Sequence, residues 1–240
     1  MAKTVAQYRR LDPDKIVATV KALQARIEGR FPGSGLGKVV AELQEVADET
    51  VTRTRWIQRP HFPLRFAAAV LSIVIIALAL LMLLNIRQFQ FNDYTNSIQA
   101  LEASISSVVF VGAAILFLVT WESRIKRHRA LKAIHELRAL AHIIDMHQLT
   151  KDPESYFAPQ QPATLKRAMT PFELNRYLDY CSEALALISK VAALYAQDFQ
   201  DPVLLDAVDD MEDLTAGFSR KIWQKLTILE GLGRSMAVNR

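Results

Sequence analysis

Cysteine is scarce in this sequence: Cys181 is the only one among 240 residues. A single cysteine excludes an internal disulfide framework and fits a reducing compartment. About sixty-five charged and amphipathic residues precede the first apolar run, so we do not expect that run to be a cleaved secretory signal. We therefore expect the apolar run to remain in the mature protein.

Charge is missing from two stretches, Phe66 to Leu84 and Ala103 to Trp121. At a rise of 1.5 Å per residue, each nineteen-residue helix would span roughly 28 Å, close to the thickness of the hydrocarbon core of a bilayer. Two buried helices of a large soluble core are the alternative, but such helices rarely run so long without a charge. We therefore expect two membrane-spanning helices. Neither contains an ionisable residue, which argues against the ion relay of a transporter.

Basic residues flank the two apolar runs on their outer sides, whereas the segment between the runs has only Arg87 against Asp93 and Glu102. Lysine and arginine are retained on the cytoplasmic side, so both termini should be cytoplasmic, in a membrane that we take to be the bacterial plasma membrane. The same cations should attract anionic lipid headgroups. A nucleic-acid partner is disfavoured, since the membrane already explains the charge. The expected headgroup contacts are Arg53, Arg55, Arg59, Arg65, Arg124, Lys126, Arg127, Arg129 and Lys132.

The chain divides into segments that predict an all-α membrane protein: a two-helix transmembrane hairpin with a cytoplasmic, coiled-coil-like helical bundle. Its parts are an N-terminal cytoplasmic helical region (1–63), transmembrane helix 1 (64–86), a short extracytoplasmic loop (87–102), transmembrane helix 2 (103–121), a cytoplasmic extension of that helix (122–152), a linker (153–169) and a C-terminal cytoplasmic helical hairpin (170–240). The extension is expected because no helix breaker occurs before Pro153.

Apolar residues in the C-terminal segment recur at alternating steps of four and three, the pattern of a helix-packing face. Thr170, Pro171 and Glu173 form a capping-box signature before the first helix, and Asp201-Pro202 marks the start of the second. A short connection makes the two helices antiparallel neighbours. The expected packing seam is Leu174, Leu178, Leu185, Ile188, Tyr195, Val208, Met211, Phe218 and Ile222.

Histidines are concentrated in the predicted extension, where His128, His135 and His142 are seven residues apart, with Asp145 nearby. Seven residues cover about 10.5 Å of helix, so no two of these three histidines can bind one metal ion from a single straight helix. A structural role at the edge of a coiled-coil seam is the leading interpretation. A pH- or metal-responsive site is the alternative, because an imidazole titrates near neutral pH.

No complete catalytic motif is present. His135-Glu136 resembles the opening of a zincin motif, but Ala139 stands where the second histidine is required. The glycine-rich segment 33–38 lacks the first glycine of a phosphate-binding loop and has Val39 after its lysine, so a helix-terminating turn is expected. The acidic stripe of the C-terminal segment suits a solvated helix face: Asp206, Asp209, Asp210 and Asp213.

These patterns favour a non-enzymatic membrane-anchored helical module that oligomerises or docks partner proteins at the cytoplasmic face of the membrane. No catalytic residue, cofactor or resident metal is expected. The first alternative is an oligomeric pore- or channel-forming two-span effector. The second is a pH- or metal-responsive membrane protein that uses the histidine stripe, and a membrane-associated enzyme is a third class.

Overall fold

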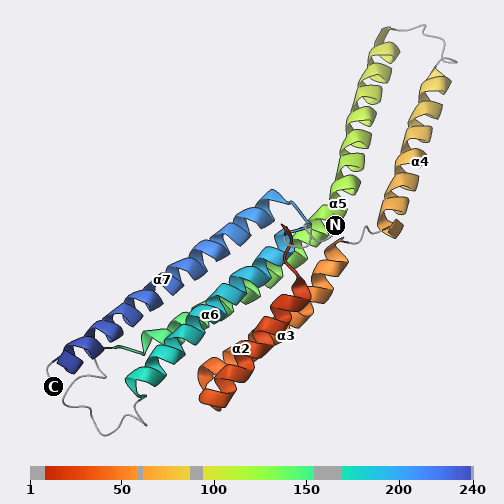
Figure 1. Cartoon of the computed structure of the whole chain (residues 1–240). Helices are drawn as coiled ribbons and strands as arrows, with labels where there is room; N and C mark the ends of the chain where they lie inside the picture. Colours follow the sequence, from red (N-terminus) through yellow and green to blue (C-terminus); the bar gives the residue numbers. More distant parts are fainter. Residues whose placement is uncertain (1–8, 59–61, 87–93, 154–168, 239–240) are drawn as a thin grey trace. The chain divides into compact units, whose positions relative to one another are not determined.

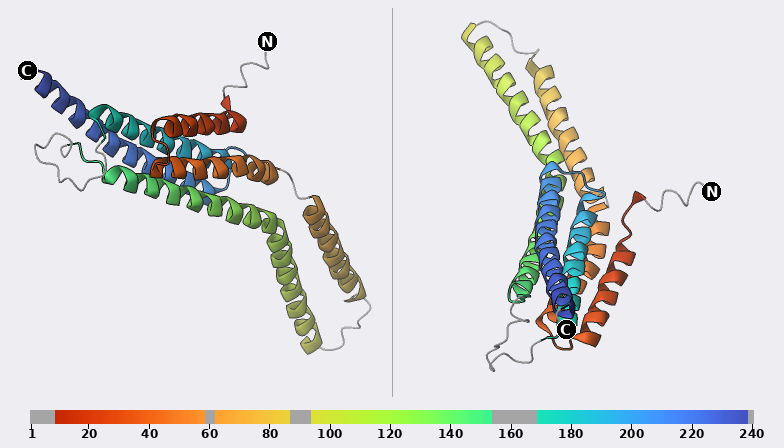
Figure 2. Two further views of the ribbon diagram at one scale, coloured as in Figure 1. Left: turned by 90° about the horizontal axis from the view of Figure 1, so that it is seen from below. Right: turned by 60° about the vertical axis from the view of Figure 1, so that its left-hand side comes forward.

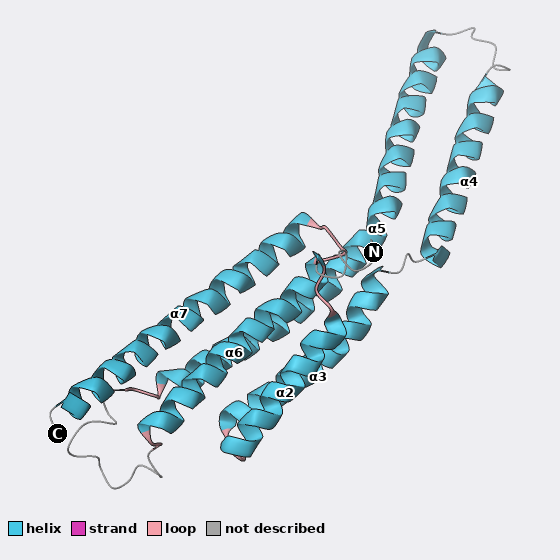
Figure 3. Cartoon of the chain, viewed as in Figure 1, coloured by secondary structure: helices cyan, strands magenta, loops and turns pink. Residues whose placement is uncertain are grey.

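The computed structural model describes residues 9–58, 62–86, 94–153 and 169–238. This described part is all-helical and contains no strand (Figure 3). The helices are α2 (Pro13–Arg30), α3 (Gly35–Gln58), α4 (Phe62–Ile86), α5 (Tyr94–Leu149), α6 (Pro171–Ala196) and α7 (Pro202–Val238). The chain forms two compact units. Unit 1 comprises Met1–Gln58 and Arg129–Arg240, and unit 2 comprises Arg59–His128.

Short capping contacts fix the two N-terminal helices. The Asp12 carboxylate accepts hydrogen bonds from the amides of Asp14 and Lys15 at the start of α2. The turn after α2 places Gly33 at φ +69°, a conformation that glycine adopts without strain. Ser34 then accepts a hydrogen bond from the Gly37 amide at 3.1 Å. Residues 31–34 thus form the turn between the two helices that the sequence predicted, and the glycine-rich segment continues from Gly35 as the first turn of α3.

The capping box predicted at the start of α6 is confirmed. Thr170 accepts from the amide of Glu173, and the Glu173 carboxylate accepts from the Thr170 amide at 2.7 Å. The Asp201 carboxylate caps α7 by accepting hydrogen bonds from the amides of Val203 and Leu204. The α6 and α7 helices pack along one another and run in opposite directions (Figure 1).

The core of unit 1 lies between the helices α2, α3, α6 and α7 and the second part of α5, which run alongside one another in every view (Figures 1 and 2). On α6, α7 and α5, the buried side chains come from the faces with three-and-four spacing. All nine residues of the expected packing seam are buried in this core: Leu174, Leu178, Leu185, Ile188, Tyr195, Val208, Met211, Phe218 and Ile222.

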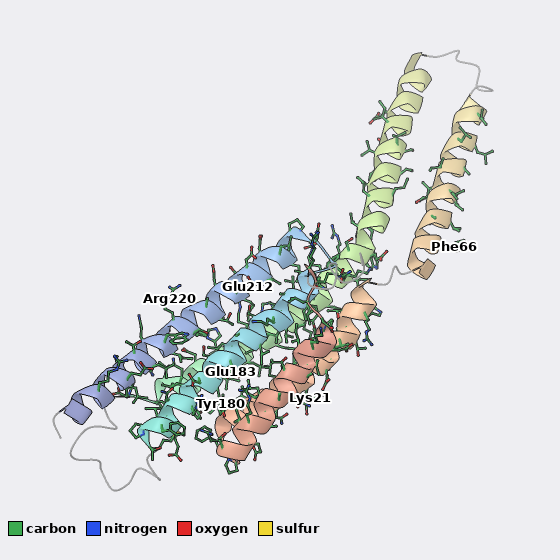
Figure 4. The ribbon with its side chains drawn as sticks, viewed as in Figure 1. Lys21, Phe66, Tyr180, Glu183, Glu212 and Arg220 are labelled. Carbon is green, nitrogen blue, oxygen red and sulfur yellow. The ribbon has the colours of Figure 1, made fainter. Side chains whose placement is uncertain are left out.

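Polar contacts fix the outer helices of unit 1 to its centre. Arg26 of α2 forms an ion pair with Glu183 of α6, and its guanidinium lies 5.6 Å from the ring centroid of Tyr180; Figure 4 labels both α6 residues. Lys225 of α7 donates to the carbonyls of Gln148 at 2.6 Å and Lys151 at 3.1 Å. Because these carbonyls belong to the end of α5 and the turn after it, Lys225 satisfies acceptors that the helix itself leaves open.

Unit 2 contains α4 and the first part of α5. Pro63 lies in the first turn of α4, where a proline costs no hydrogen bond. The α5 helix begins at Tyr94, so residues 94–102, which the sequence assigned to the loop, are helical; they contain no glycine or proline to interrupt the helix. Residues 87–93 of that loop and 154–168 of the predicted linker lie outside the described residues.

Large apolar side chains are exposed along both helices of unit 2, among them Phe66, labelled in Figure 4, at 73% and Phe110 at 74%. Within the described residues, one helical stretch, Ile105–Leu149, is long and apolar enough to cross a membrane. Only 6% of the apolar window in this stretch is buried within the structure.

Candidate functional site

A pocket of about 360 Å³ opens in unit 1 between the end of α3, the last turn of α6 and the part of α5 that follows Arg129. Arg53 and Trp56 lie three residues apart on α3, and Arg129 and Lys132 are three apart on α5, so each pair shares one face of its helix. Its lining is Thr52, Arg53, Trp56, Arg129, Lys132 and Tyr195. We call this site the cationic pocket.

The two cations that α5 contributes to the cationic pocket differ from Arg53 in their partners. The Arg129 guanidinium stacks over the Trp56 ring, 4.1 Å from its centroid. In the part of the chain that the structure describes, neither Arg129 nor Lys132 forms an ion pair with a carboxylate. Both side chains are exposed to solvent, so their positive charge is available at the mouth of the pocket.

Arg53 is engaged by two acids. Its guanidinium donates to Glu136 of α5 at 2.8 Å and to Glu49 of its own helix at 2.5 Å. The hydrogen bond to Glu136 is the largest cause that raises the pKa of Arg53 above its ordinary value. The charge of Arg53 is therefore compensated, and its side chain is a fixed part of the lining of the cationic pocket. Its hydrogen bond to Glu136 also connects α3 to α5.

Tyr195 supplies the third side of the cationic pocket, from α6. Its hydroxyl forms a hydrogen bond of 3.1 Å with the Thr50 hydroxyl, which in turn donates to the Val46 carbonyl of its own helix. Burial raises the pKa of Tyr195, against smaller opposing effects of Thr50 and Arg53. The phenol therefore stays neutral near pH 7 and is held at a fixed position by α3.

Three of the nine residues expected to contact lipid headgroups thus meet in one pocket, Arg53, Arg129 and Lys132. Arg55 instead lies 3.7 Å from Asp14 of α2. The side chains of Arg59 and Arg65 lie outside the described residues. The other three belong to unit 2: Arg124, whose guanidinium lies over the Phe117 ring, Lys126, which pairs with Glu122 at 2.9 Å, and Arg127.

The histidine stripe lies on the exposed face of α5. His135 and His142 belong to unit 1 and are both exposed, while the buried face of α5 in that unit is formed by residues such as Leu137, Ala141 and Ile144. The ring of His142 meets the edge of Phe218 from α7, with centroids 5.4 Å apart. These two histidines therefore lie outside the buried seam. His128 belongs to unit 2 and is also exposed.

His147, the fourth histidine of the same segment, is set apart from the stripe. Its ring packs against Gly35 at the start of α3, so closely that a Cβ at Gly35 would collide with it. Asp145, the carboxylate considered beside the stripe, accepts a hydrogen bond from Gln148 at 2.7 Å. Among the described residues no cluster of three or more His, Cys, Asp or Glu side chains is arranged to hold a metal ion.

A second three-and-four pattern follows the exposed face of α5. It passes through His135, Ala139, His142, Met146 and Leu149, all exposed, and none of the five is an aspartate, glutamate, lysine or arginine. Met146 is 65% exposed and Leu149 is 57% exposed. Exposed apolar groups in helical register are typical of a surface that meets another helix. We call these five residues the outer stripe of α5.

The sequence predicted the three cations of the cationic pocket as headgroup contacts, but it did not predict that they line one pocket. Trp56 and Tyr195 are 139 positions apart, and no local pattern connects them. The available signal was the i, i+3 spacing of Arg53 with Trp56 and of Arg129 with Lys132, which places each pair on one helix face. The outer stripe was readable from its spacing, but only the tertiary structure shows that its five side chains are exposed.

Comparisons of the chain with protein-family models, with curated proteins and with solved structures found no match.

Proposed function

We propose that the protein is a non-enzymatic, membrane-anchored helical module whose cytoplasmic bundle associates with a second copy of itself through the outer stripe of α5. One observation carries the proposal: the same chain contains a unit with an exposed apolar surface and a packed helical bundle on which the outer stripe is exposed. In this interpretation unit 2 is the anchor, and unit 1 is the interaction module.

The support for an anchor comes from the surface of unit 2. Phe66, Phe110 and Leu116 expose 67% or more of their surface, and the charge-free runs extend along both helices. In water such helices would aggregate, because exposed apolar area of this extent is strongly disfavoured. In a lipid bilayer the same surface is solvated by the acyl chains, and the flanking arginines and lysines meet the headgroups.

The support for self-association comes from the outer stripe. Its five residues cover about 21 Å of helix, the length of two heptads. Ala139, the second of the five residues, permits close approach of a second helix, and Met146 adapts to an irregular neighbour. Asp210, from the acidic stripe on α7, forms an ion pair with Arg138 of α5 at 3.4 Å, so α7 borders the outer stripe at this point.

Self-association is tested by substituting Met146→Glu and measuring mass in detergent by light scattering across a dilution series. A carboxylate inside a helix–helix contact must be desolvated, so the dissociation constant should rise at least about tenfold, while helicity and thermal stability stay unchanged. Val203→Glu, which places the same charge at an exposed apolar position on α7, is the matched control and should dissociate like the wild type. A wild-type protein that is monomeric throughout contradicts self-association.

Two further measurements separate the alternatives that the sequence leaves open. Liposomes that contain the protein should retain an entrapped dye if it is an anchored module, and dye release would favour the pore-forming effector. Replacing His128, His135 and His142 by glutamine should leave the mass unchanged between about pH 5.5 and 8 if these side chains have only a structural role on the surface of α5, because this window brackets the ordinary pKa of an imidazole. A pH-dependent mass in the wild type alone would favour the pH-responsive alternative.

A further inference from the structure

We propose that the cationic pocket binds a phosphate group, carried by an amphipathic ester, between Lys132 and Arg129. This inference does not depend on the proposed function, because the pocket is formed within unit 1 alone. The same phosphate chemistry could be supplied by a phospholipid headgroup or by a soluble phosphate.

The charge of the site favours a small anion. Arg53 is already compensated by Glu49 and Glu136, but Lys132 and Arg129 face the cavity without a carboxylate partner in the described structure. A phosphate group carries up to two negative charges and accepts several hydrogen bonds at once. Two neighbouring cations one helical turn apart match such a group better than they match a single carboxylate.

The geometry of Arg129 also suits a phosphate. The Arg129 guanidinium lies over the Trp56 ring, with its Cζ 4.1 Å from the ring centroid, so the indole covers one side of the guanidinium and restrains it. Its N–H donors lie in the plane of the group, around the edge, and so remain available for hydrogen bonds to oxygen. Because contact with the indole already restrains the Arg129 side chain, binding a ligand would cost less conformational entropy here than at an unrestrained arginine.

The volume and walls of the pocket point to an ester and not to the bare ion. A cavity of about 360 Å³ lies at the small end of the range for small-molecule sites, roughly 300–1,000 Å³. It would hold roughly twelve water molecules at about 30 Å³ each, far more space than one phosphate group fills. The rest of the wall is mostly carbon, from the rings of Trp56 and Tyr195 and the stems of the charged side chains. An apolar or weakly polar group attached to the phosphate would occupy that part.

Trp56 provides a local signal for the test. The sequence has three tryptophans, and Trp121 and Trp223 are both exposed, so Trp121→Phe with Trp223→Phe leaves Trp56 as the only indole without altering the core. The full chain in detergent is titrated with dihexanoyl phosphatidate, with dihexanoylglycerol and with inorganic phosphate while Trp56 emission is recorded. Dihexanoylglycerol has the same tails and no phosphate.

We expect a saturable change in Trp56 emission with the phosphatidate and none with dihexanoylglycerol. Lys132→Gln and Arg129→Gln should each raise the dissociation constant about 10- to 100-fold, the effect of losing one charged hydrogen bond. Lys190→Gln removes an exposed lysine of α6 that is not in the pocket and should bind like the parent. Circular dichroism of each variant checks that the helices are intact.

The arms of the titration also identify the source. If inorganic phosphate also saturates the signal at a similar concentration, the proposal is supported and the ligand is a soluble phosphate. If only the phosphatidate saturates it, the proposal is supported and the ligand is a lipid headgroup. The proposal is overturned if neither phosphate compound gives a saturable change, if dihexanoylglycerol binds equally well, or if Lys132→Gln and Arg129→Gln both bind like the parent.

Discussion

Cys181 shows how the environment of one residue sets its chemistry. Its side chain is completely buried in the core of unit 1, on the face of α6 that carries Leu174, Leu178 and Leu185. Burial raises the pKa of the thiol to about 12, with smaller opposing effects from Lys151 and Lys225. The thiolate, which is the reactive form, is therefore nearly absent at neutral pH. Cys181 behaves as a small apolar core residue.

The raised pKa of Cys181 predicts a difference between the wild type and Cys181→Ala at high pH. Because the folded pKa exceeds the unfolded value, the folded state holds the proton more tightly, and stability is lost as pH rises from about 9 towards 12. The free energy of unfolding, measured with urea, should fall more steeply over this window in the wild type than in the variant. Equal slopes would contradict the assignment. At pH 8 the native thiol should also resist alkylation until denaturant is added.

At the scale of single elements, the ends of the helices were the most predictable features. Asp12, Thr170 and Asp201 are short-range signals, since each side chain caps amides two or three residues further along. The start of α5 was less readable. Residues 94–102 contain no capping signal strong enough to distinguish loop from helix, and a polar helix start resembles a loop in composition.

The capping box of α6 leads to a prediction at this scale. Thr170→Ala removes the oxygen that accepts from the Glu173 amide, and it should reduce the free energy of unfolding by about 1 kcal/mol. Thr227→Ala is the matched control, because the Thr227 hydroxyl only bonds to the Trp223 carbonyl of its own helix. Urea unfolding monitored by circular dichroism gives both values. A loss from Thr170→Ala no larger than that from the control would contradict the cap.

At the scale of the whole molecule, the expected topology places both ends of the chain on the cytoplasmic side. The prediction is tested with single cysteines in a Cys181→Ala background, at the exposed positions Thr19 of α2 and Thr227 of α7. A membrane-impermeant maleimide should label neither position in intact bacterial spheroplasts and both after permeabilisation, because basic flanks are retained inside.

The control for this topology experiment is Ser97→Cys, within the predicted extracytoplasmic segment 87–102, which should be labelled in intact spheroplasts. Labelling of Thr19→Cys or of Thr227→Cys without permeabilisation would contradict the cytoplasmic placement of that end of the chain, and labelling of only one of them would contradict a common side. Recovery of the protein from the soluble fraction without detergent would refute the anchor itself.

The sequence by itself determined the helical class, the caps and the packing face of the C-terminal helices, because these depend on contacts within a few residues or on a simple repeat. It also identified the two charge-free runs, since length and hydropathy are local properties. Only the tertiary structure decided which helices cover the apolar face of α5, because that depends on how distant segments of the chain pack together. The cationic pocket was decided in the same way: Trp56, Arg129 and Tyr195 come from three helices, and their proximity is a product of packing.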